Sequence, residues 1–478
     1  MARTKVLLVE LNEITWDLID PLMAQGKLPT FARLKREGVW AAPMSVDLPP
    51  QLDPWITWTT LYTGCPQAVH NVYFLEQPPE TIRARRIWEI CRRQGLKIGV
   101  YGSLCSWPPQ RVNGFYVPDT FARDSSTYPE SLQPIQELNL TYTRSIRLPS
   151  DQDSLMFKAK LGAKLIRLGL RPATMARIAK QLASERVDAG LRWRRVGLQP
   201  LVNFDFFSKL YLERRPDFAT FHSNHVAHYM HTYWKAMQPE AFEQGATEDE
   251  IRRYGGAIEY GYRTADELLQ RVLSLLDTET TLVVASSMGQ KPFVSQLRDG
   301  KPICQLRSLD RLLEILEMQG KARTLSMMSD QFNIYFEDAG IREELEQKIR
   351  DAYVDAPEQR MFAIVELGDC LTASLNYFDD VSEDSRCVFP HLGERGVFRY
   401  SDLVYNTGHI KSGCHDPRGM MLLYGAGIRA GGWIKECDNL DVAPTLLKLM
   451  GMSAPPEMKG RVLTEAFART HERFEVAA

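Results

Sequence analysis

Four of the nine histidines in this chain lie within ten residues, and side chains of this type can bind a metal or hold a phosphate. They recur at a spacing of three: His222, His225, His228 and His231. On a helix, residues three apart are surface neighbours, so successive imidazoles can face one ligand. The run therefore predicts a metal or phosphate site. The alternative is a polar helix face that binds no ligand.

Two carboxylates and a carboxamide follow an apolar run near the N-terminus. The run covers residues 5–9 and predicts a buried strand, after which come Glu10, Asn12 and Glu13. Ligands of open α/β sheets sit at the carboxyl ends of strands, so these side chains are candidate metal ligands. The alternative is a helix start, with Asn12 or Thr15 as the cap and Glu13 in the first turn.

A third segment, residues 53–64, combines one carboxylate with several hydroxyls. Asp53 precedes Pro54, and the hydroxyls belong to Thr57, Thr59, Thr60 and Thr63. A hydroxyl becomes a nucleophile when a base or a metal lowers its pKa, so Thr57 and Asp53 are candidate catalytic residues. The alternative is a helix capped by Asp53 with Pro54 at its first position.

A fourth segment, residues 407–419, places two histidines and an arginine in a glycine-rich stretch before a predicted strand. His409 and His415 can approach a ligand closely there, and Arg418 can clamp an oxyanion. The alternative is an ordinary polar loop, since loops carry both functional and non-functional polar residues.

Strand and helix patterns alternate around these segments. The predicted strands are 5–9, 97–101, 281–285 and 420–424, and the predicted helices are 16–37, 84–94, 260–276 and 441–450. This alternation predicts an α/β fold, a three-layer sandwich with a mostly parallel central sheet. We expect one core built from residues 1–124, 256–294 and 401–478. Two mainly helical cap insertions, 125–255 and 295–400, interrupt it.

The composition is that of an ordinary globular chain and excludes several classes of protein. Of 478 residues, 44% are hydrophobic and 25% charged, and the formal net charge is −2. A near-neutral chain gives no argument for a nucleic-acid partner. The sequence shows no signal-peptide pattern and no transmembrane run. Its eight cysteines are scattered without a CxxC pair, so we expect reduced thiols and a cytoplasmic location.

One stretch is strongly basic. Residues 158–195 hold eleven Lys/Arg against two acidic residues, a local charge of +9 that leaves −11 on the rest of the chain. Leucine, isoleucine and methionine recur within it at roughly helical spacing. The pattern suggests a cationic cap over an anionic substrate, or a helix that lies on anionic lipid as a peripheral membrane contact. The alternative is a solvated helix face packed on the core.

Several segments together resemble the alkaline-phosphatase superfamily, particularly its type I phosphodiesterase/nucleotide pyrophosphatase branch. The segments are VLLVELNEITWDLIDPLMAQGKLPTFARLKREG, WTTLYTGCPQAVHNV, GLKIGVYGSLCSWPP, FHSNHVAHYMHTYW, LVVASSMG, SGCHDPRGMMLLYGAGI and NLDVAPTLLKLMGMSAPPEMKGRVL. The resemblance covers both ends of the chain and fades over 125–215 and 291–400. It implies a hydrolase in which two metal ions, held by six Asp/His ligands, clamp an in-line phosphoryl displacement at a Thr or Ser nucleophile.

The chain departs from that pattern at most ligand positions. The first Asp falls on Asn12, and the nucleophile falls on Pro54, or on Asp53 after a one-residue shift, with Thr57 the nearest downstream hydroxyl. The middle Asp falls on Asn224 if His228 is the ligand, or on Ala227 if His231 is. The Asp-His of the family's Ser-Asp-His-Gly falls on Ser287 and Met288, whereas His415 fills its position.

These departures predict a reduced metal site. Ser, Met and neutral Asn are weak ligands for a hard divalent ion. We therefore expect one metal ion instead of two, with zinc as the expected metal. The alternative is that the site binds no metal. Carboxylates that can rebuild the site are Glu10, Glu13 and Asp53. The resemblance implies hydrolysis of a phosphate or sulfate ester or diester, with His225, His409 and Arg418 as substrate-binding residues. The substrate would be an anionic small molecule or glycoconjugate. The alternative is a non-catalytic relative that binds an anionic ligand or a partner protein.

Overall fold

The computed structural model describes residues 3–144, 163–295, 298–299, 301–327, 330–376, 378 and 380–468. The chain forms two compact units. The first contains Met1–Asn71, Arg83–Asp299 and Ser412–Ala478, and the second contains Val72–Ile82 and Gly300–Lys411. The second unit corresponds to the predicted insertion 295–400, extended to residue 411 and joined by a short segment that we expected in the core. No helix among the described residues is long and apolar enough to cross a membrane.

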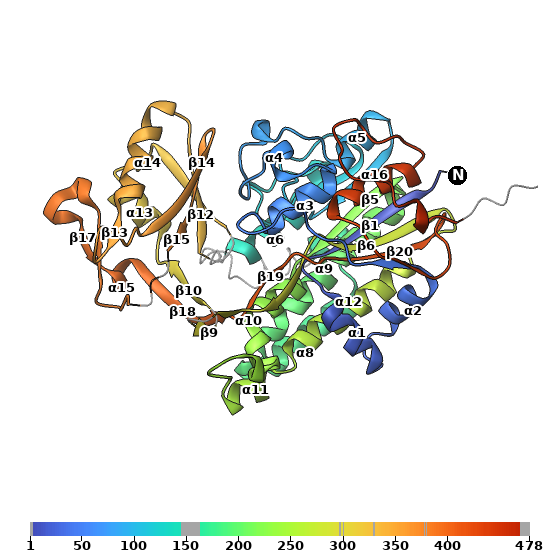
Figure 1. The fold of residues 1–478 in the computed structure, drawn as a ribbon, viewed down its shortest axis with the longest axis horizontal. Helices are drawn as coiled ribbons and strands as arrows, with labels where there is room; N and C mark the ends of the chain where they lie inside the picture. Colours follow the sequence, from blue (N-terminus) through green and yellow to red (C-terminus); the bar gives the residue numbers. More distant parts are fainter. Residues whose placement is uncertain are drawn as a thin grey trace, which may run out of the picture. The chain divides into compact units, whose positions relative to one another are not determined.

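An eight-stranded sheet forms the centre of the first unit (Figure 1). Its order is β21-β2-β20-β6-β1-β5-β3-β4. The strands are β1 (Lys5–Leu11), β2 (Val39–Ala41), β3 (Lys97–Tyr101), β4 (Asn113–Val117), β5 (Phe218–Ser223), β6 (Thr280–Ser286), β20 (Met420–Gly425) and β21 (Gly432–Ile434). Of these, β20 alone runs against its neighbours. The predicted α/β class with a mostly parallel sheet is confirmed.

Helices cover both faces of this sheet. Below it in Figure 1 lie α1 (Trp16–Ala24), α2 (Pro29–Glu37), α8 (Pro172–Val187), α10 (His225–Met237) and α12 (Ala257–Leu273). Above it lie α3 (Pro54–Thr63), α4 (Gln67–His70), α5 (Ile87–Arg93) and α16 (Val442–Leu449). The remaining helices of this unit are α6 (Gln133–Arg144), α9 (Gln199–Arg214) and α11 (Glu248–Tyr254). The arrangement is the three-layer sandwich that the alternating pattern predicted.

The segment 125–255 is not an insertion throughout. Its strand β5 pairs in parallel with both β1 and β3, so it lies inside the central sheet. Helix α9 then packs against β3, β4 and β5. The fully buried Phe207 of α9 contacts Phe221 of β5, with ring centroids 5.0 Å apart. Helical patterns lie on both sides of β5, and nothing in the sequence marks where the core resumes. The sequence therefore led us to include β5 in the predicted cap.

Helix 16–37 is also divided differently from the prediction. Thr15 caps α1 by accepting a hydrogen bond from Asp17 N at 3.3 Å. The chain turns at Gly26, whose φ is +71°, and α2 begins with Pro29 at its first position. Proline restricts the residue before it to extended backbone, so a continuous helix cannot pass residues 28–29.

The second unit has its own hydrophobic core and contains more strand than the helical cap we expected. Its four-stranded antiparallel sheet consists of β11 (Ala322–Ser326), β12 (Gln331–Phe336), β15 (Cys370–Leu375) and β14 (Phe362–Leu367). The smaller sheets use β10 (Lys301–Leu306), β18 (Val404–Lys411), β13 (Tyr353–Val354), β16 (Arg386–Val388) and β17 (Val397–Arg399). The helices are α13 (Leu309–Ile315), α14 (Arg342–Asp351) and α15 (Tyr400–Leu403).

We expect Phe207→Ala to lower the free energy of unfolding by about 3–5 kcal/mol, because it leaves a cavity among packed aromatic rings. Leu212→Ala is the matched control on the same helix. Leu212 is 53% exposed, so its loss should change stability by no more than about 0.5 kcal/mol. Urea denaturation of both variants measures the difference, and equal effects would contradict the assignment of α9 to the core.

Candidate metal centre

The candidate site lies at the carboxyl edge of the central sheet. Strand β1 ends at Leu11, and the backbone N–H of Asn12 donates to Ser223 O at the end of β5, at 3.0 Å. The next residue, Glu13, has a φ of +62°. A non-glycine residue in this region costs about 1–3 kcal/mol and persists where the surroundings hold it in place. The strained turn directs a carboxylate to the edge where α/β sheets bind ligands.

Three ligand-type side chains converge there. The Nε2 atom of His231, on α10, lies 2.9 Å from Oε2 of Glu13, and Nε2 of His415 lies 3.8 Å from the same oxygen. One donor atom from each of the three residues lies within 4.8 Å of the other two. Glu13 is 1% exposed, and the two imidazoles are partly buried. These three residues can hold a metal ion. The sequence left His228 and His231 as alternatives, and it is His231 that lies in this group.

Both imidazoles meet an oxygen atom at each ring nitrogen. Nδ1 of His231 lies 3.0 Å from the backbone oxygen of Gly413, and Nδ1 of His415 lies 2.7 Å from that of Leu52. A neutral imidazole has one N–H and one lone pair, so it cannot donate to two oxygens. With the N–H directed to the carbonyl, each Nε2 presents a lone pair toward the Glu13 carboxylate. A cation placed between these atoms removes the conflict, and this carbonyl contact is the usual second partner of a metal-bound histidine.

Glu13 is held as a carboxylate. Burial acts to raise its pKa, but positive charge on the imidazoles of His231 and His415, together with hydrogen bonds from His231 and Gln290, outweighs burial and lowers the pKa to about 2. Gln290 Nε2 donates to Glu13 Oε2 and, at 3.1 Å, to Ala227 O. A buried negative charge with two imidazoles beside it favours a bound cation.

A short hairpin positions two of these groups. Strand β19 (Gly413–Asp416) pairs antiparallel with β7 (Gly289–Pro292), and His415 lies opposite Gln290. A Cβ atom at Gly413 would lie 2.5 Å from Met230 O and 2.4 Å from Gln290 Oε1. Only glycine therefore allows the hairpin to approach α10 closely enough for the Gly413 carbonyl to meet His231.

Two predicted ligands hold the site together instead of joining the group. Asn12 Nδ2 donates to Glu13 Oε1 at 2.9 Å and to Asn224 Oδ1 at 2.7 Å. Asn12 Oδ1 accepts from Trp58 Nε1 at 2.7 Å. The carboxamides of Asn12 and Asn224 therefore orient the Glu13 carboxylate. This corrects the expectation that they bind a metal directly.

The residues at the family's other ion do not form a second metal site among the described residues. The Ser287 hydroxyl is buried and hydrogen-bonded to Thr57 Oγ1 at 2.8 Å, and Met288 is buried. Thr57 has one further partner, Pro54 O, at 3.5 Å. Neither partner is a base that can take the Thr57 proton, so the geometry does not support Thr57 as a nucleophile.

Glu10 belongs to a separate buried network. Its carboxylate accepts from Tyr62 at 2.7 Å and from Ser103 at 2.9 Å, and lies 3.0 Å from His222 Nδ1. Side chains alternate along a strand, so Glu10 points to the opposite sheet face from its neighbours Val9 and Leu11. Glu10 is therefore engaged by Tyr62, Ser103 and His222 and is not one of the three grouped residues Glu13, His231 and His415, contrary to the prediction.

The other histidines of the run are placed apart. His225 is buried, with Nδ1 2.8 Å from Ser223 Oγ and Nε2 3.1 Å from Gly261 O. Burial lowers its pKa to about 4, so it is a neutral structural residue and not the substrate-binding group we predicted. His228 lies on the exposed side of α10.

The remaining predicted residues have distinct environments. Asp53 immediately precedes α3, but its side chain makes no capping hydrogen bond to that helix, and its Oδ1 lies 3.5 Å from His415 Nδ1. Arg418 is paired with Asp17 at 2.8 Å and with Asp416 at 3.1 Å, which argues against the predicted oxyanion clamp. His409 is on β18 in the second unit, and its side chain lies outside the described residues.

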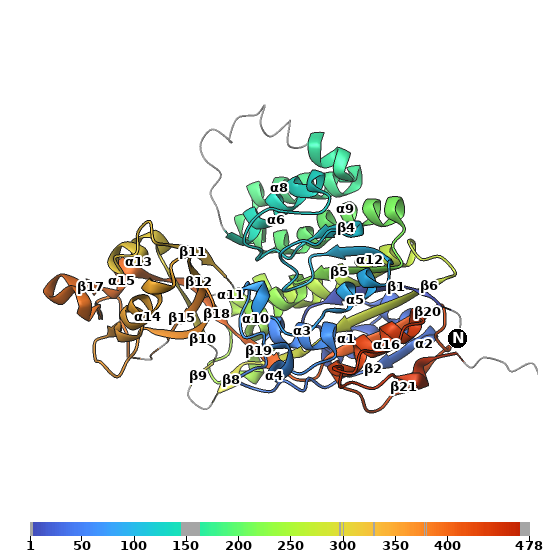
Figure 2. The same cartoon turned by 90° about the horizontal axis from the view of Figure 1, so that it is seen from above.

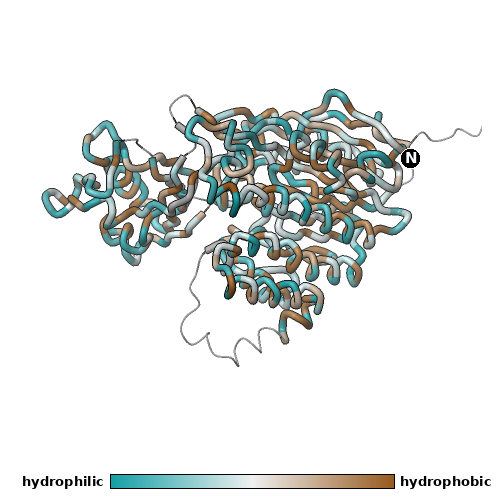
Figure 3. The backbone as a smooth tube through the Cα atoms, turned by 90° about the horizontal axis from the view of Figure 1, so that it is seen from below, coloured by the Kyte–Doolittle hydropathy of each residue, from teal (hydrophilic) through white to brown (hydrophobic). Residues whose placement is uncertain are grey.

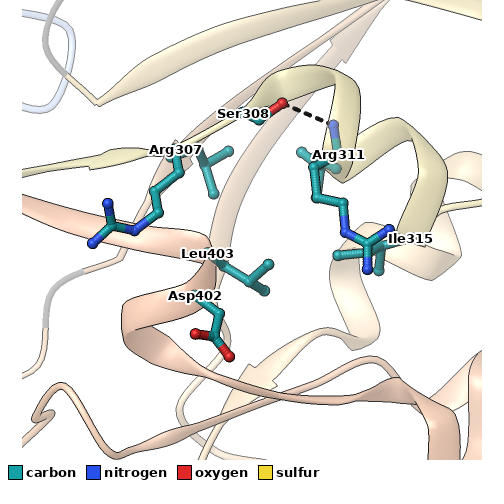
Figure 4. Close-up of a pocket in the computed structure, with 8 residues that line it drawn as sticks. Arg307, Ser308, Arg311, Ile315, Asp402 and Leu403 are labelled. Carbon is teal, nitrogen blue, oxygen red and sulfur yellow. Dashed lines mark hydrogen bonds between the residues drawn. The ribbon is translucent and has the colours of Figure 1, made fainter.

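A pocket in the second unit does not involve these residues. Figure 4 shows it between Arg307, Arg311 and Asp402, with Leu403 and Ile315 beside them. Ser308 Oγ accepts from the backbone N–H of Arg311 at 3.1 Å, which caps α13. None of its lining residues is a candidate from the sequence, and the lining shows ordinary helix-capping contacts.

The fold is of the α/β class, and the grouped residues Glu13, His231 and His415 form a possible site for one metal ion. The model of the type I phosphodiesterase/nucleotide pyrophosphatase family matches residues 6–384, so the chain belongs to that family, within the alkaline-phosphatase superfamily. Its members are metal-dependent hydrolases of phosphoesters. The match confirms the resemblance seen in the sequence.

Solved structures with a related chain have low sequence identity. Murine ectonucleotide pyrophosphatase/phosphodiesterase 5 is 12% identical, covering 97% of this chain and 100% of its own, with a TM-score of 0.43. The human protein of that name is 14% identical over 97% and 100%, with a TM-score of 0.42. Phosphonoacetate hydrolase from Sinorhizobium meliloti 1021 is 15% identical over 94% and 96%, with a TM-score of 0.39. A comparison with curated proteins found no match.

Sequence reasoning missed Gln290 and the carbonyl groups of Leu52 and Gly413. Gln290 lies two residues after Met288, in the segment that lost the family's Asp-His pair, so a polar residue just beyond a degraded motif was an available signal. The carbonyl contacts had none, because every residue carries a carbonyl and only the fold decides which one meets an imidazole.

We expect the protein to bind one equivalent of Zn²⁺, and we expect His231→Ala and His415→Ala each to weaken binding more than about 100-fold by removing a ligand. Gln290→Ala, which removes only a supporting hydrogen bond, should weaken binding about 10–100-fold. His228→Ala is the matched control on α10 and should bind like the wild type. Calorimetric titration with the metal alone measures all four. Two equivalents, or equal losses at His228 and His231, would contradict the three-residue site.

A second buried histidine gives a pH-dependent stability. His70 is fully buried at the end of α4, its Nε2 lies 3.0 Å from Thr60 Oγ1, and burial lowers its pKa to about 3 from 6.5. The folded protein thus excludes a proton that the unfolded chain binds below pH 6.5. The stabilisation from a neutral His70 is present above pH 6.5 and is lost as the pH falls toward 3.

We therefore expect His70 to contribute a loss of about 1.4 kcal/mol of unfolding free energy per pH unit between about pH 6 and 4. His70→Gln should remove this part of the slope, whereas the exposed His228→Gln should keep it. Urea denaturation at several pH values provides the slopes. The assignment fails if the two variants show the same pH dependence.

Proposed function

We propose that this chain hydrolyses a phosphate ester or diester at a single zinc ion held by Glu13, His231 and His415. The observation that carries the proposal is the pair of imidazoles with oxygen acceptors at both nitrogens, which face one buried carboxylate. Two histidines and one glutamate are a donor set of catalytic zinc sites, which keep a position open for water or substrate. Family membership supports phosphoester hydrolysis as the reaction class.

A zinc ion at these residues would supply Lewis-acid charge and lower the pKa of a water molecule. The chain's own contribution is to fix the two imidazoles through Leu52 and Gly413 and the carboxylate through Asn12 and Gln290. Supporting contacts of this kind keep ligand geometry within the narrow range that hydrolysis needs. The site therefore depends on residues from β1, α10 and the β7–β19 hairpin together.

Asp53 is the proton acceptor that we propose, because it is a partly exposed carboxylate beside a candidate ligand histidine. Its carboxylate is 32% exposed and lies 3.5 Å from His415 Nδ1, at the start of α3. A positioned carboxylate of this kind typically contributes about 10²–10⁴-fold as a general base. Thr57 is buried against Ser287, so attack by water, with Asp53 as base, fits the geometry better than a covalent threonine intermediate.

The substrate that we propose is an anionic small molecule or the anionic headgroup of a glycoconjugate. The N-terminal end of α3, beside Asp53 and His415, carries the positive end of a helix dipole, which favours a phosphate group. Arg418 is not part of this recognition, because two carboxylates already pair with it.

A second candidate function is binding without catalysis. It is favoured by the residues at the family's other ion, where Ser287 and Met288 are buried and Asn12 is bonded to protein atoms. A protein of this kind would hold an anionic ligand at the same three residues but would not turn it over.

Activity measurements on zinc-loaded protein separate these functions. We expect hydrolysis of bis-p-nitrophenyl phosphate, and a kcat about 10²–10⁴-fold lower in Asp53→Asn, because the base is lost. Thr57→Val keeps the side-chain shape without the hydroxyl and should retain kcat within about threefold, since no proton leaves that group.

His228→Ala is the control for changes on α10 and should keep full activity. Absence of turnover on phosphate diester, phosphate monoester and sulfate ester panels, with one zinc ion bound, would favour the binding function. Loss of turnover in Thr57→Val with Asp53→Asn unaffected would overturn the assignment of Asp53.

A further inference from the structure

Helix α8 has a largely reversed polarity, since its inner side is mostly polar and its half-buried Ile178 is packed against the hydrophobic core. Its buried positions are the polar residues Thr174, Gln181 and Glu185. Gln181 Nε2 donates to Glu185 Oε1 at 3.0 Å and to Leu191 O at 2.9 Å. A surface helix of a globular protein normally turns its apolar side inward, so this helix needs an explanation for its outer side.

The outer side of α8 is apolar and cationic. Met175 is 37% exposed, Leu182 45% and Val187 91%, and they lie beside the exposed Lys180 and Arg186. The other exposed positions of the helix are alanine and proline, and none is acidic. The preceding turn repeats this composition with Lys164, Ile166 and Arg167, and Ile166 is 49% exposed.

The cationic side chains on the outer side of α8 can contact a ligand, whereas two other cations of the basic stretch are held in ion pairs. Arg195 pairs with the buried Glu185, and Arg177 pairs with Glu267. Lys164, Arg167, Lys180 and Arg186 make no ion pair with any carboxylate of the described residues. These four cations all lie within residues 163–187 of the basic stretch 158–195. Residues 158–162 lie outside the described part of the chain.

This face lies at the outside of the first unit. Helix α8 packs on the 3-10 helix η4 (Ala189–Leu198) and on α9, and α9 in turn packs on the sheet. Figure 2 shows α8 beyond α9 on the side away from the sheet, and in Figure 3 the helices of this part alternate between hydrophobic and hydrophilic positions. The face is therefore presented outward as a surface.

We propose that the outer face of residues 163–187 binds the surface of an anionic lipid bilayer, with Met175, Leu182 and Val187 entering the headgroup region and Lys180 and Arg186 contacting lipid phosphates. Apolar and cationic side chains without acidic ones are what an interfacial helix needs. A nucleic acid would use the cations but leave the apolar side chains in water. The chain outside the basic stretch 158–195 carries a net charge of −11, so repulsion from an anionic surface orients this face toward it.

The test is co-flotation of the full chain with vesicles of equal parts phosphatidylglycerol and phosphatidylcholine, compared with pure phosphatidylcholine vesicles, in 50 mM and 500 mM NaCl. We expect binding to the anionic vesicles in low salt and weak binding in the other three conditions. Each cationic side chain near such a surface contributes a factor of about five, so Lys180→Glu/Arg186→Glu should lower partitioning at least about thirty-fold. Met175→Ser/Leu182→Ser should lower it several-fold.

Arg92→Glu/Arg93→Glu makes the same charge change at exposed positions of α5 and should partition like the wild type. The proposal is overturned if the wild type does not float with anionic vesicles in low salt, or if the α5 control loses as much binding as the α8 variant. It is also overturned if the serine variant binds like the wild type, since the apolar residues then contribute nothing. Light scattering that shows self-association through this face without lipid would overturn it as well.

Discussion

The site depends on one electrostatic constraint. Two imidazoles lie within a few ångströms of the same buried carboxylate, and a backbone carbonyl oxygen contacts the other side of each ring. The Leu52 and Gly413 carbonyls fix the Nδ1 atoms of His415 and His231, so the Nε2 atoms have to face Glu13. With neutral rings, lone pairs face a buried carboxylate, and a positive charge at this place, from a bound cation or from protonated imidazoles, removes that repulsion. The strained backbone at Glu13 and the close contact at Gly413 are part of this arrangement.

This constraint explains how the metal-ligand residues of the family can change in this chain while a possible ligand group remains. The carboxylate expected at Asn12 returns one residue later, at Glu13, and the positive φ of the turn directs it inward. The carboxamide left at Asn12 then supports it from behind and links it to Asn224 and Trp58. The other ion's positions have no such replacement among the described residues, since Ser287 and Met288 are buried and Ser287 bonds to Thr57. The groups that can bind a cation are thus gathered at one place, around Glu13.

The direction of the side chains distinguishes two helices, α8 and α9, whose compositions look alike in the sequence. Helix α9 buries its aromatic residues against the sheet, as an inner helix must. Helix α8 has a comparable length but buries Gln181 and Glu185 and turns Leu182 and Val187 outward. Apolar and cationic residues occur in both segments, so composition alone does not reveal the reversal. The reversed helix marks a surface for contact, whereas α9 marks the core.

The sequence by itself determined the fold class, half of the strands of the central sheet and the family, because these depend on local patterns along the chain. The apolar run that became β1, the run that became β3 and the helix that became α12 are readable without neighbours. It also supplied Glu13, His231 and His415 as candidates, but together with Glu10, His225 and His228, which share their residue types. Choosing among them required the tertiary structure, because packing places Glu10 in a separate buried network, buries His225 and leaves His228 at the surface. The division of the helix at Pro29 was readable from local rules. In contrast, the place of β5 in the sheet and the carbonyl partners of the imidazoles arise from contacts between distant segments, and no local pattern carries that information.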